Sequence, residues 1–178
     1  ETPLEVAELE AARRDLEAAE RLRPQDPEVL FQLFDEWYES VYARVVPDRL
    51  ERAAAVLDRL AGLDPAVLAE HREKIEDLKI SVLLGQARLA FKRADTEARL
   101  ALAERWRELE GDNRRKFLPF ATRLYLLAGR LDLAEEAVKA YKAGIEDMAG
   151  VNQAVRDSVT LLDASLAWAR GHWYDVID

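Results

Sequence analysis

Apolar residues recur every three or four positions along almost the whole chain, which is the spacing of one face of an α-helix. The first such stretch runs from Pro3 to Leu22. Thr2 can cap its first turn, and Pro3 suits the first helical position, where a backbone N–H has no partner. No segment alternates apolar and polar residues as a β-strand does. The pattern therefore predicts an all-α fold.

Prolines, glycines and capping residues divide the rest of the chain into further helices. Asp26 can cap the second helix, and either Asp95 or Thr96 can cap a later one. The stretch 66–93 contains no proline and only one glycine, Gly85, so it is either one long helix or two helices with a bend. The other helices are expected at about 27–44, 48–60, 96–110, 114–128, 132–148 and 152–170.

Small residues and similar helix ends recur along the chain, which is typical of a helical repeat protein. Two helices end alike, at Leu22-Arg23-Pro24 and at Leu63-Asp64-Pro65. Small residues let paired helices approach closely, and the candidates for these contacts are Ala12, Ala53, Ala98 and Ala134. Further repeat positions are Trp37, Leu57 and Leu60, then Leu84-Gly85-Gln86-Ala87, then Leu118, Ala121, Tyr125, Gly129 and Val138.

In these positions the chain resembles a tetratricopeptide-repeat (TPR) array, whose unit of about 34 residues pairs two antiparallel helices. The resemblance implies a TPR-like right-handed α-solenoid of about four repeats, with partial units at both ends. It implies that 1–178 form a single repeat domain that is a piece of a longer array. The approximate repeat units are 1–26, 27–65, 66–112, 113–150 and 151–178. Val41 and Thr122 replace the small glycine of the family pattern, so we expect those helix pairs to be wider. The alternative is a helical bundle with coincidental spacing.

Composition narrows the function classes. The 178 residues include 35 Asp and Glu against 26 Lys and Arg, a net charge of −9, which disfavours a nucleic-acid partner. The absence of cysteine excludes disulfides and thiolate metal sites. No apolar run reaches the ~18 residues of a membrane span, so we expect no membrane insertion of this segment. A soluble protein of the bacterial cytoplasm or periplasm is the expectation.

Catalytic motifs are missing from the sequence. His71 lies among charged residues, in the wrong helical phase for a di-iron site, and is expected at the surface. His172 follows Gly171 and is expected in a loop. No glycine-rich phosphate loop, His-Glu-x-x-His or Gly-x-Ser-x-Gly motif occurs. We therefore expect a protein that is not an enzyme and that has no cofactor or metal.

The TPR resemblance implies a concave groove, lined by the first helix of each pair, that binds a partner protein or peptide. Carrying the groove-facing positions of that family onto this sequence selects aromatic, basic and polar residues, which suit an extended acidic segment. These partner-binding candidates are Tyr38, Tyr42, Lys79, Gln86, Lys116, Arg123, Ser165 and Trp168. The alternative is that the tyrosines pack between helices and the charges are ordinary helix surface.

The sequence thus predicts a non-enzymatic protein–protein interaction scaffold. Long bacterial arrays of this kind suggest an envelope, secretion or polysaccharide-export assembly, by analogy at the level of the fold. The alternative is a helical accessory or regulatory domain of a larger enzyme or transcriptional regulator. No pattern in the sequence indicates the partner's identity or the oligomeric state.

Overall fold

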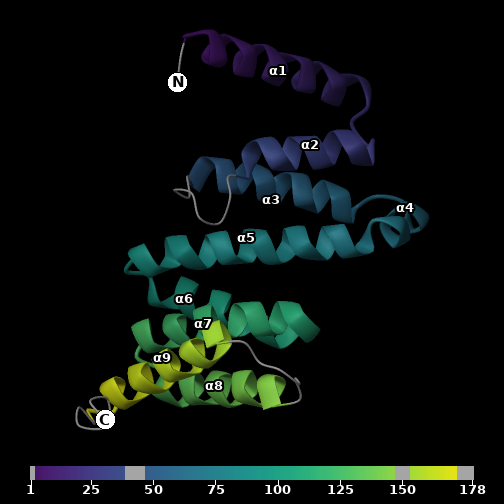
Figure 1. Cartoon of the computed structure of the whole chain (residues 1–178). Helices are drawn as coiled ribbons and strands as arrows, with labels where there is room; N and C mark the ends of the chain where they lie inside the picture. Colours follow the sequence, from purple (N-terminus) through teal and green to yellow (C-terminus); the bar gives the residue numbers. More distant parts are fainter. Residues whose placement is uncertain (1–2, 39–46, 147–152, 172–178) are drawn as a thin grey trace. The chain divides into compact units, whose positions relative to one another are not determined.

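The computed structural model describes residues 3–38, 47–146 and 153–171, and the regular structure of those residues is entirely helical (Figure 1). The all-α prediction is therefore confirmed. The helices are α1 (Pro3–Leu22), α2 (Pro27–Trp37), α3 (Pro47–Ala61), α4 (Pro65–Glu70), α5 (Arg72–Lys92), α6 (Thr96–Glu104), the 3-10 helix η1 (Arg105–Glu108), α7 (Gly111–Leu127), α8 (Leu131–Glu146) and α9 (Gln153–Ala169). The chain divides into two compact units, 1–85 and 86–178, and α5 contributes to both.

Aspartate caps explain the starts of α2, α4 and α6. The Asp26 carboxylate accepts hydrogen bonds from the backbone N–H groups of Glu28 and Val29, which otherwise have no partner at the start of α2. Asp95 caps α6 in the same way, through the N–H of Ala98. Gly129 adopts a φ of +73° after α7, and the next N–H, from Arg130, donates to the Tyr125 carbonyl. This geometry closes the helix end as the sequence predicts.

Helix α2 is shorter than the predicted 27–44. It ends at Trp37, because Tyr38 has an extended backbone (φ −93°, ψ 99°). The Tyr38 ring stacks on Phe34 at a centroid distance of 5.3 Å, and its hydroxyl donates to the Ser81 carbonyl oxygen at 2.9 Å. A contact with distant α5 thus accompanies the end of α2. The remaining residues of the predicted helix, 39–44, lie outside the described part of the chain.

The stretch 66–93 forms two helices, α4 and α5, which meet at His71 (φ −106°, ψ 12°). The His71 ring packs edge-on against Phe31 of α2, with ring centroids 5.2 Å apart. His71, expected at the surface, is only partly exposed because of this contact. Both backbone groups of His71 remain hydrogen-bonded, the N–H to Val67 and the carbonyl oxygen to Ile75. The bend therefore leaves neither group unpaired.

In unit 1–85, α1 packs against α2 and α2 packs against α3. Leu30, Phe31 and Phe34 of α2 are almost completely buried there. The Leu50 side chain of α3 lies directly against Gly85 of α5, since a Cβ added to this glycine would lie 2.9 Å from Leu50 Cδ1. This close approach is the role that the small residue was expected to have.

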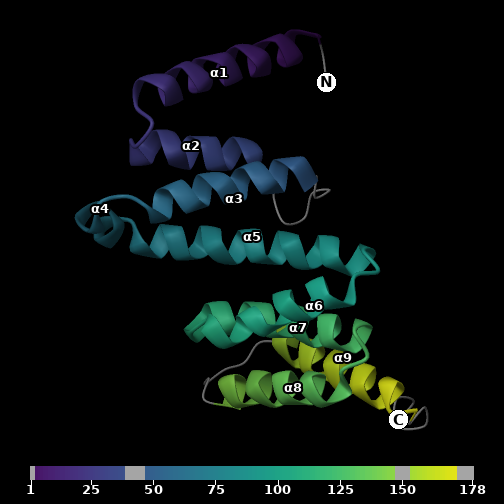
Figure 2. The ribbon, with the colours of Figure 1, turned by 180° about the vertical axis from the view of Figure 1, so that it is seen from behind.

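In unit 86–178, α6 packs against α7, α7 against α8, and α9 against both α7 and α8 (Figures 1 and 2). Ala134 is fully buried, as expected for a close helix contact, and so is Ala53 in the other unit. Ala98 is exposed, and Ala103 is the fully buried alanine of α6, so the predicted register was wrong in this helix. Helix α6 also ends at Glu104 and continues as η1, short of the predicted end near Glu110. The side chain of Ala12 is outside the described part of the chain.

Candidate functional site

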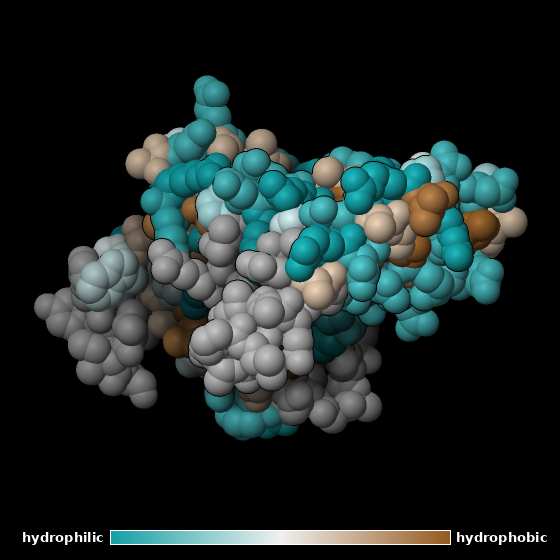
Figure 3. Space-filling view, turned by 90° about the horizontal axis from the view of Figure 1, so that it is seen from above, coloured by the Kyte–Doolittle hydropathy of each residue, from teal (hydrophilic) through white to brown (hydrophobic). Residues whose placement is uncertain are grey.

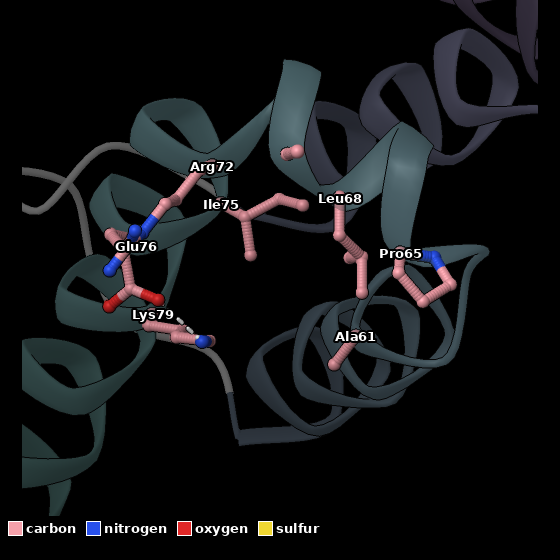
Figure 4. A pocket seen from close by; sticks show the side chains of 8 residues that line it. Ala61, Pro65, Leu68, Arg72, Ile75, Glu76 and Lys79 are labelled. Carbon is pink, nitrogen blue, oxygen red and sulfur yellow. Dashed lines mark hydrogen bonds and ion pairs between the residues drawn. The ribbon is translucent and has the colours of Figure 1, made fainter.

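A half-open cavity of about 300 Å³ lies in unit 1–85, where the end of α3, helix α4 and the first turns of α5 meet. We call it the elbow cavity. Its apolar wall consists of Ala61, Pro65, Leu68, Ala69 and Ile75. Its charged rim consists of Arg72, Glu76 and Lys79. Figure 4 shows the three charged side chains on one side of the cavity and Leu68, Pro65 and Ala61 on the opposite side.

Short-range and long-range contacts together build this elbow. The Asp64 carboxylate accepts the N–H of Ala66 at 2.8 Å and starts α4, with Pro65 in the first helical position. After the bend at His71, the Lys74 ammonium lies 3.8 Å above the centroid of the Phe31 ring. Phe31 therefore contacts both the bend residue His71 and the first turn of α5. These contacts place Leu68 of α4 and Arg72 of α5 on opposite walls of one cavity.

The apolar wall ends in a buried floor and an accessible edge. Ile75 is only 3% exposed, Leu68 is partly exposed, and Ala69 is exposed. The alanines have no atoms beyond Cβ, so they leave space that longer side chains would fill. Figure 3, which views the molecule from above, shows brown hydrophobic residues toward the right of the view among mostly teal hydrophilic ones.

The rim has one positive charge more than it has negative charges. Lys79 pairs with Glu76, with Nζ and Oε1 2.6 Å apart, on adjacent turns of α5. The Arg72 guanidinium is exposed and makes no hydrogen bond or ion pair with any residue that the structure describes. Guanidinium groups pair with carboxylates through two parallel hydrogen bonds. The elbow cavity can thus accept an apolar side chain and an anionic group side by side.

Of the predicted binding residues, only Lys79 lines this cavity. Tyr38 is partly buried against Phe34, with its hydroxyl bonded to the backbone of α5. Tyr42 lies outside the described residues. Gln86 is partly exposed on the part of α5 that belongs to unit 86–178.

The other predicted residues lie on α7 and α9. Lys116 and Arg123 are exposed two turns apart on α7, and Lys116 Nζ lies 3.8 Å from Asp112. On α9, Trp168 is 59% exposed, and the Ser165 hydroxyl donates to the Leu161 carbonyl oxygen one turn back. The spacing places Lys116 and Arg123 on the same face of α7, and it places Ser165 and Trp168 on the same face of α9.

A second polar cluster lies in unit 86–178, centred on Tyr125. The buried Tyr125 hydroxyl donates to Glu104 at 2.7 Å, and Glu104 also accepts from Arg107 Nε at 2.6 Å. Arg107 binds Glu136 of α8 through two hydrogen bonds of 2.6 and 2.9 Å. The Trp106 indole N–H is buried beside this cluster without a hydrogen-bond partner among the described residues. We call Glu104, Arg107, Tyr125 and Glu136 the Tyr125 network.

The Tyr125 network shifts the pKa of its members. Burial raises the pKa of Tyr125 strongly, and the hydrogen bond to Glu104 raises it further, whereas the nearby Trp106 indole opposes the rise. Burial also raises the pKa of Glu104, but hydrogen bonds from Arg107 and Tyr125 outweigh it, so this pKa lies below its usual value. The Arg107 hydrogen bonds lower the pKa of Glu136. At neutral pH both carboxylates are therefore ionised, which suits a structural ion pair.

Sequence reasoning missed Leu68, Ala69 and Arg72. The sequence left open whether 66–93 form one long helix or two helices with a bend, because 66–71 contain no proline or glycine that would mark the bend. One local signal was present, since Asp64-Pro65 is a helix start directly after the end of α3. The break at His71 depends on Phe31, a residue of another helix, and periodicity along the chain contains no information about it.

Among residues 3–38, 47–146 and 153–171, no group of three or more His, Cys, Asp or Glu side chains is placed to hold a metal ion. No described helix combines the length and apolar character needed to cross a membrane. No protein-family model, curated protein or solved structure matches this chain.

Proposed function

We propose that this chain is a non-enzymatic interaction scaffold that binds a segment of a partner protein. The elbow cavity is the observation that carries this proposal, because it combines an apolar wall with the Arg72 guanidinium, which has no partner among the residues that the structure describes. Binding pockets commonly have a mostly apolar lining and a few polar groups that orient the ligand. Lys79, a residue that the sequence selects for partner binding, lies on the rim of the same cavity.

The proposal includes the TPR-like right-handed α-solenoid and its concave binding face. In unit 86–178, α7 packs against α8 and the next helix, α9, packs against both, an arrangement that favours stacked helix pairs. The close approach of Leu50 to Gly85 in the other unit favours the same interpretation. The exposed Lys116 and Arg123 of α7 would form a second contact surface for the partner. A bacterial envelope, secretion or polysaccharide-export assembly is the setting that such arrays suggest.

Site-specific photocrosslinking tests the proposal. A photoreactive phenylalanine analogue replaces Glu70, an exposed residue that follows the wall residue Ala69 and does not itself line the elbow cavity. We expect this position to capture a protein from the source cells. The same analogue at Lys139, an exposed residue of α8, is the matched control and should capture much less of that protein.

The captured protein must then bind the purified chain. We expect Arg72→Glu to raise the Kd for this partner at least about tenfold, since the guanidinium becomes a like charge for an acidic segment. Lys139→Glu makes the same change of net charge away from the cavity and should leave the Kd nearly unchanged. Equal affinity of the partner for both variants, or no specific capture at position 70, would contradict a scaffold that works through the elbow cavity.

A further inference from the structure

From the elbow cavity we infer the chemistry of the partner segment: a bulky aliphatic side chain directly followed by a side-chain carboxylate within one peptide. This inference rests on the proposed function and makes it more specific. The elbow cavity belongs wholly to unit 1–85, so the argument uses only residues of that unit.

The wall determines the apolar part of the ligand. All of its lining side chains are aliphatic or proline, so they offer no hydrogen-bond partner to a polar group that enters. A polar side chain would lose its hydration there without compensation, whereas an aliphatic one gains from leaving water. A cavity of roughly 150 Å³ can hold a benzene molecule. About 300 Å³ is therefore enough for one leucine-sized or isoleucine-sized side chain and part of its backbone.

The rim determines the charged part. The Glu76 carboxylate is already paired with Lys79 at 2.6 Å, whereas Arg72 has no partner in the described chain. A ligand carboxylate would pair with the free guanidinium and leave the Glu76–Lys79 pair intact. A ligand cation would compete with Lys79 for Glu76 and would be repelled by Arg72. Charge complementarity thus favours an anionic group, even though the whole chain has a net charge of −9.

Geometry links the two parts. Ile75 and Arg72 lie within one turn of α5, and Figure 4 shows the charged side chains next to Ile75 and across the cavity from Leu68. An aliphatic side chain against Ile75 therefore places its neighbouring residue at the rim. We assign the carboxylate to the adjacent position of the same peptide for this reason.

Titration of the isotope-labelled full chain with three short synthetic peptides tests this inference by NMR. The peptides share a neutral Gly/Ser sequence and differ at two central positions: Leu-Glu, Leu-Gln or Ala-Glu. We expect the Leu-Glu peptide to shift the amide resonances of α4 and of the first turns of α5. The Leu-Gln and Ala-Glu peptides should bind at least about fivefold more weakly, since each lacks one of the two contacts.

Two variants examine the two contacts separately. Arg72→Gln removes the guanidinium, and Ala69→Leu fills the cavity without a change of charge; both positions are exposed, so the fold should persist. Each variant should bind the Leu-Glu peptide about tenfold more weakly than the unchanged chain does, whereas Lys139→Gln should bind it equally well. Equal binding of Leu-Glu and Leu-Gln, unchanged affinity in Arg72→Gln, or no binding at millimolar peptide would overturn the inference.

These results are distinguishable from a failure of the proposed function. Capture of a partner at position 70 without binding of the Leu-Glu peptide would refute the assigned partner chemistry and leave the scaffold in place. Binding of the Leu-Glu peptide without capture of any protein would support the chemistry of the cavity and refute the scaffold.

Discussion

The two units of the chain use arginine in opposite ways. In unit 86–178, Arg107 joins two carboxylates, Glu104 and Glu136, and thereby connects the end of α6 to α8. In unit 1–85, Arg72 stands on the rim of a cavity and has no partner among the described residues. A cation whose bonds are satisfied within the fold contributes to stability, whereas an unpaired cation beside an apolar wall is available to a ligand.

The same contrast holds for small residues. Ala134 in unit 86–178 is fully buried, where it permits a close helix contact. Ala69 in unit 1–85 is exposed and leaves space in the elbow cavity. A small residue therefore indicates either close packing or an open pocket, and its burial decides between them.

The largest expected effect comes from overpacking unit 86–178. We predict that Ala134→Leu lowers the free energy of unfolding by about 1–3 kcal/mol, because the buried site has no room for three more carbons. Ala98→Leu, at an exposed position of α6, should change the free energy by less than about 0.5 kcal/mol. Urea unfolding measures both. A neutral Ala134→Leu variant would mean that α8 packs in a different register.

A matched pair of arginine substitutions compares the two units directly. Arg107→Gln should lower the free energy of unfolding by about 1 kcal/mol, since it leaves Glu104 and Glu136 without their shared cation in a partly exposed site. Arg72→Gln should leave the free energy of unfolding nearly unchanged. Thermal or urea unfolding of the two variants provides the measurement. An equal loss of unfolding free energy in both would contradict the distinction between a structural Arg107 and a ligand-binding Arg72.

Acid should weaken the Tyr125 network selectively. The pKa values of Glu104 and Glu136 are lowered in the folded state, so their stabilising contribution is complete above the pKa of an unfolded glutamate, about 4.3. It is lost as the pH falls through the lower pKa of the folded state. Urea unfolding between pH 6 and pH 3 should show a loss that is smaller in Glu104→Gln than in the unchanged chain. Identical pH profiles would exclude a contribution of Glu104.

The smallest effect on stability is expected for the exposed face of α7. Lys116→Glu together with Arg123→Glu should leave the melting temperature nearly unchanged, because both side chains are exposed and Lys116 pairs only weakly with Asp112. The same double variant should weaken binding of the captured partner, as measured by calorimetry. Unaltered affinity would restrict the partner's contact to the elbow cavity.

Part of the candidate site could be predicted from sequence. Lys79 was selected, because the TPR resemblance assigns that position to the groove. Arg72 and Leu68 were not, because they share a wall only after the chain bends at His71. Thr122 illustrates another limit. Its side chain is fully buried, and its hydroxyl donates a hydrogen bond to the Leu118 carbonyl oxygen at 2.9 Å. The sequence indicated only that threonine stands where the repeat pattern has glycine, and this does not predict the hydrogen bond.

The sequence by itself determined the all-α fold and most helix limits, because helical periodicity, Asp caps, and the glycine and proline signals act within a few residues. It therefore correctly predicted α1, the Asp26 cap and the ends of α7 and α9 at Gly129 and Gly171. Of the two caps that it allowed for α6, Asp95 and Thr96, the structure has Asp95. Tertiary structure decided the end of α2 at Tyr38, the bend at His71 and the burial of Ala103 in place of Ala98. These features depend on contacts with side chains and backbone groups of other helices, and only the folded chain brings those groups together.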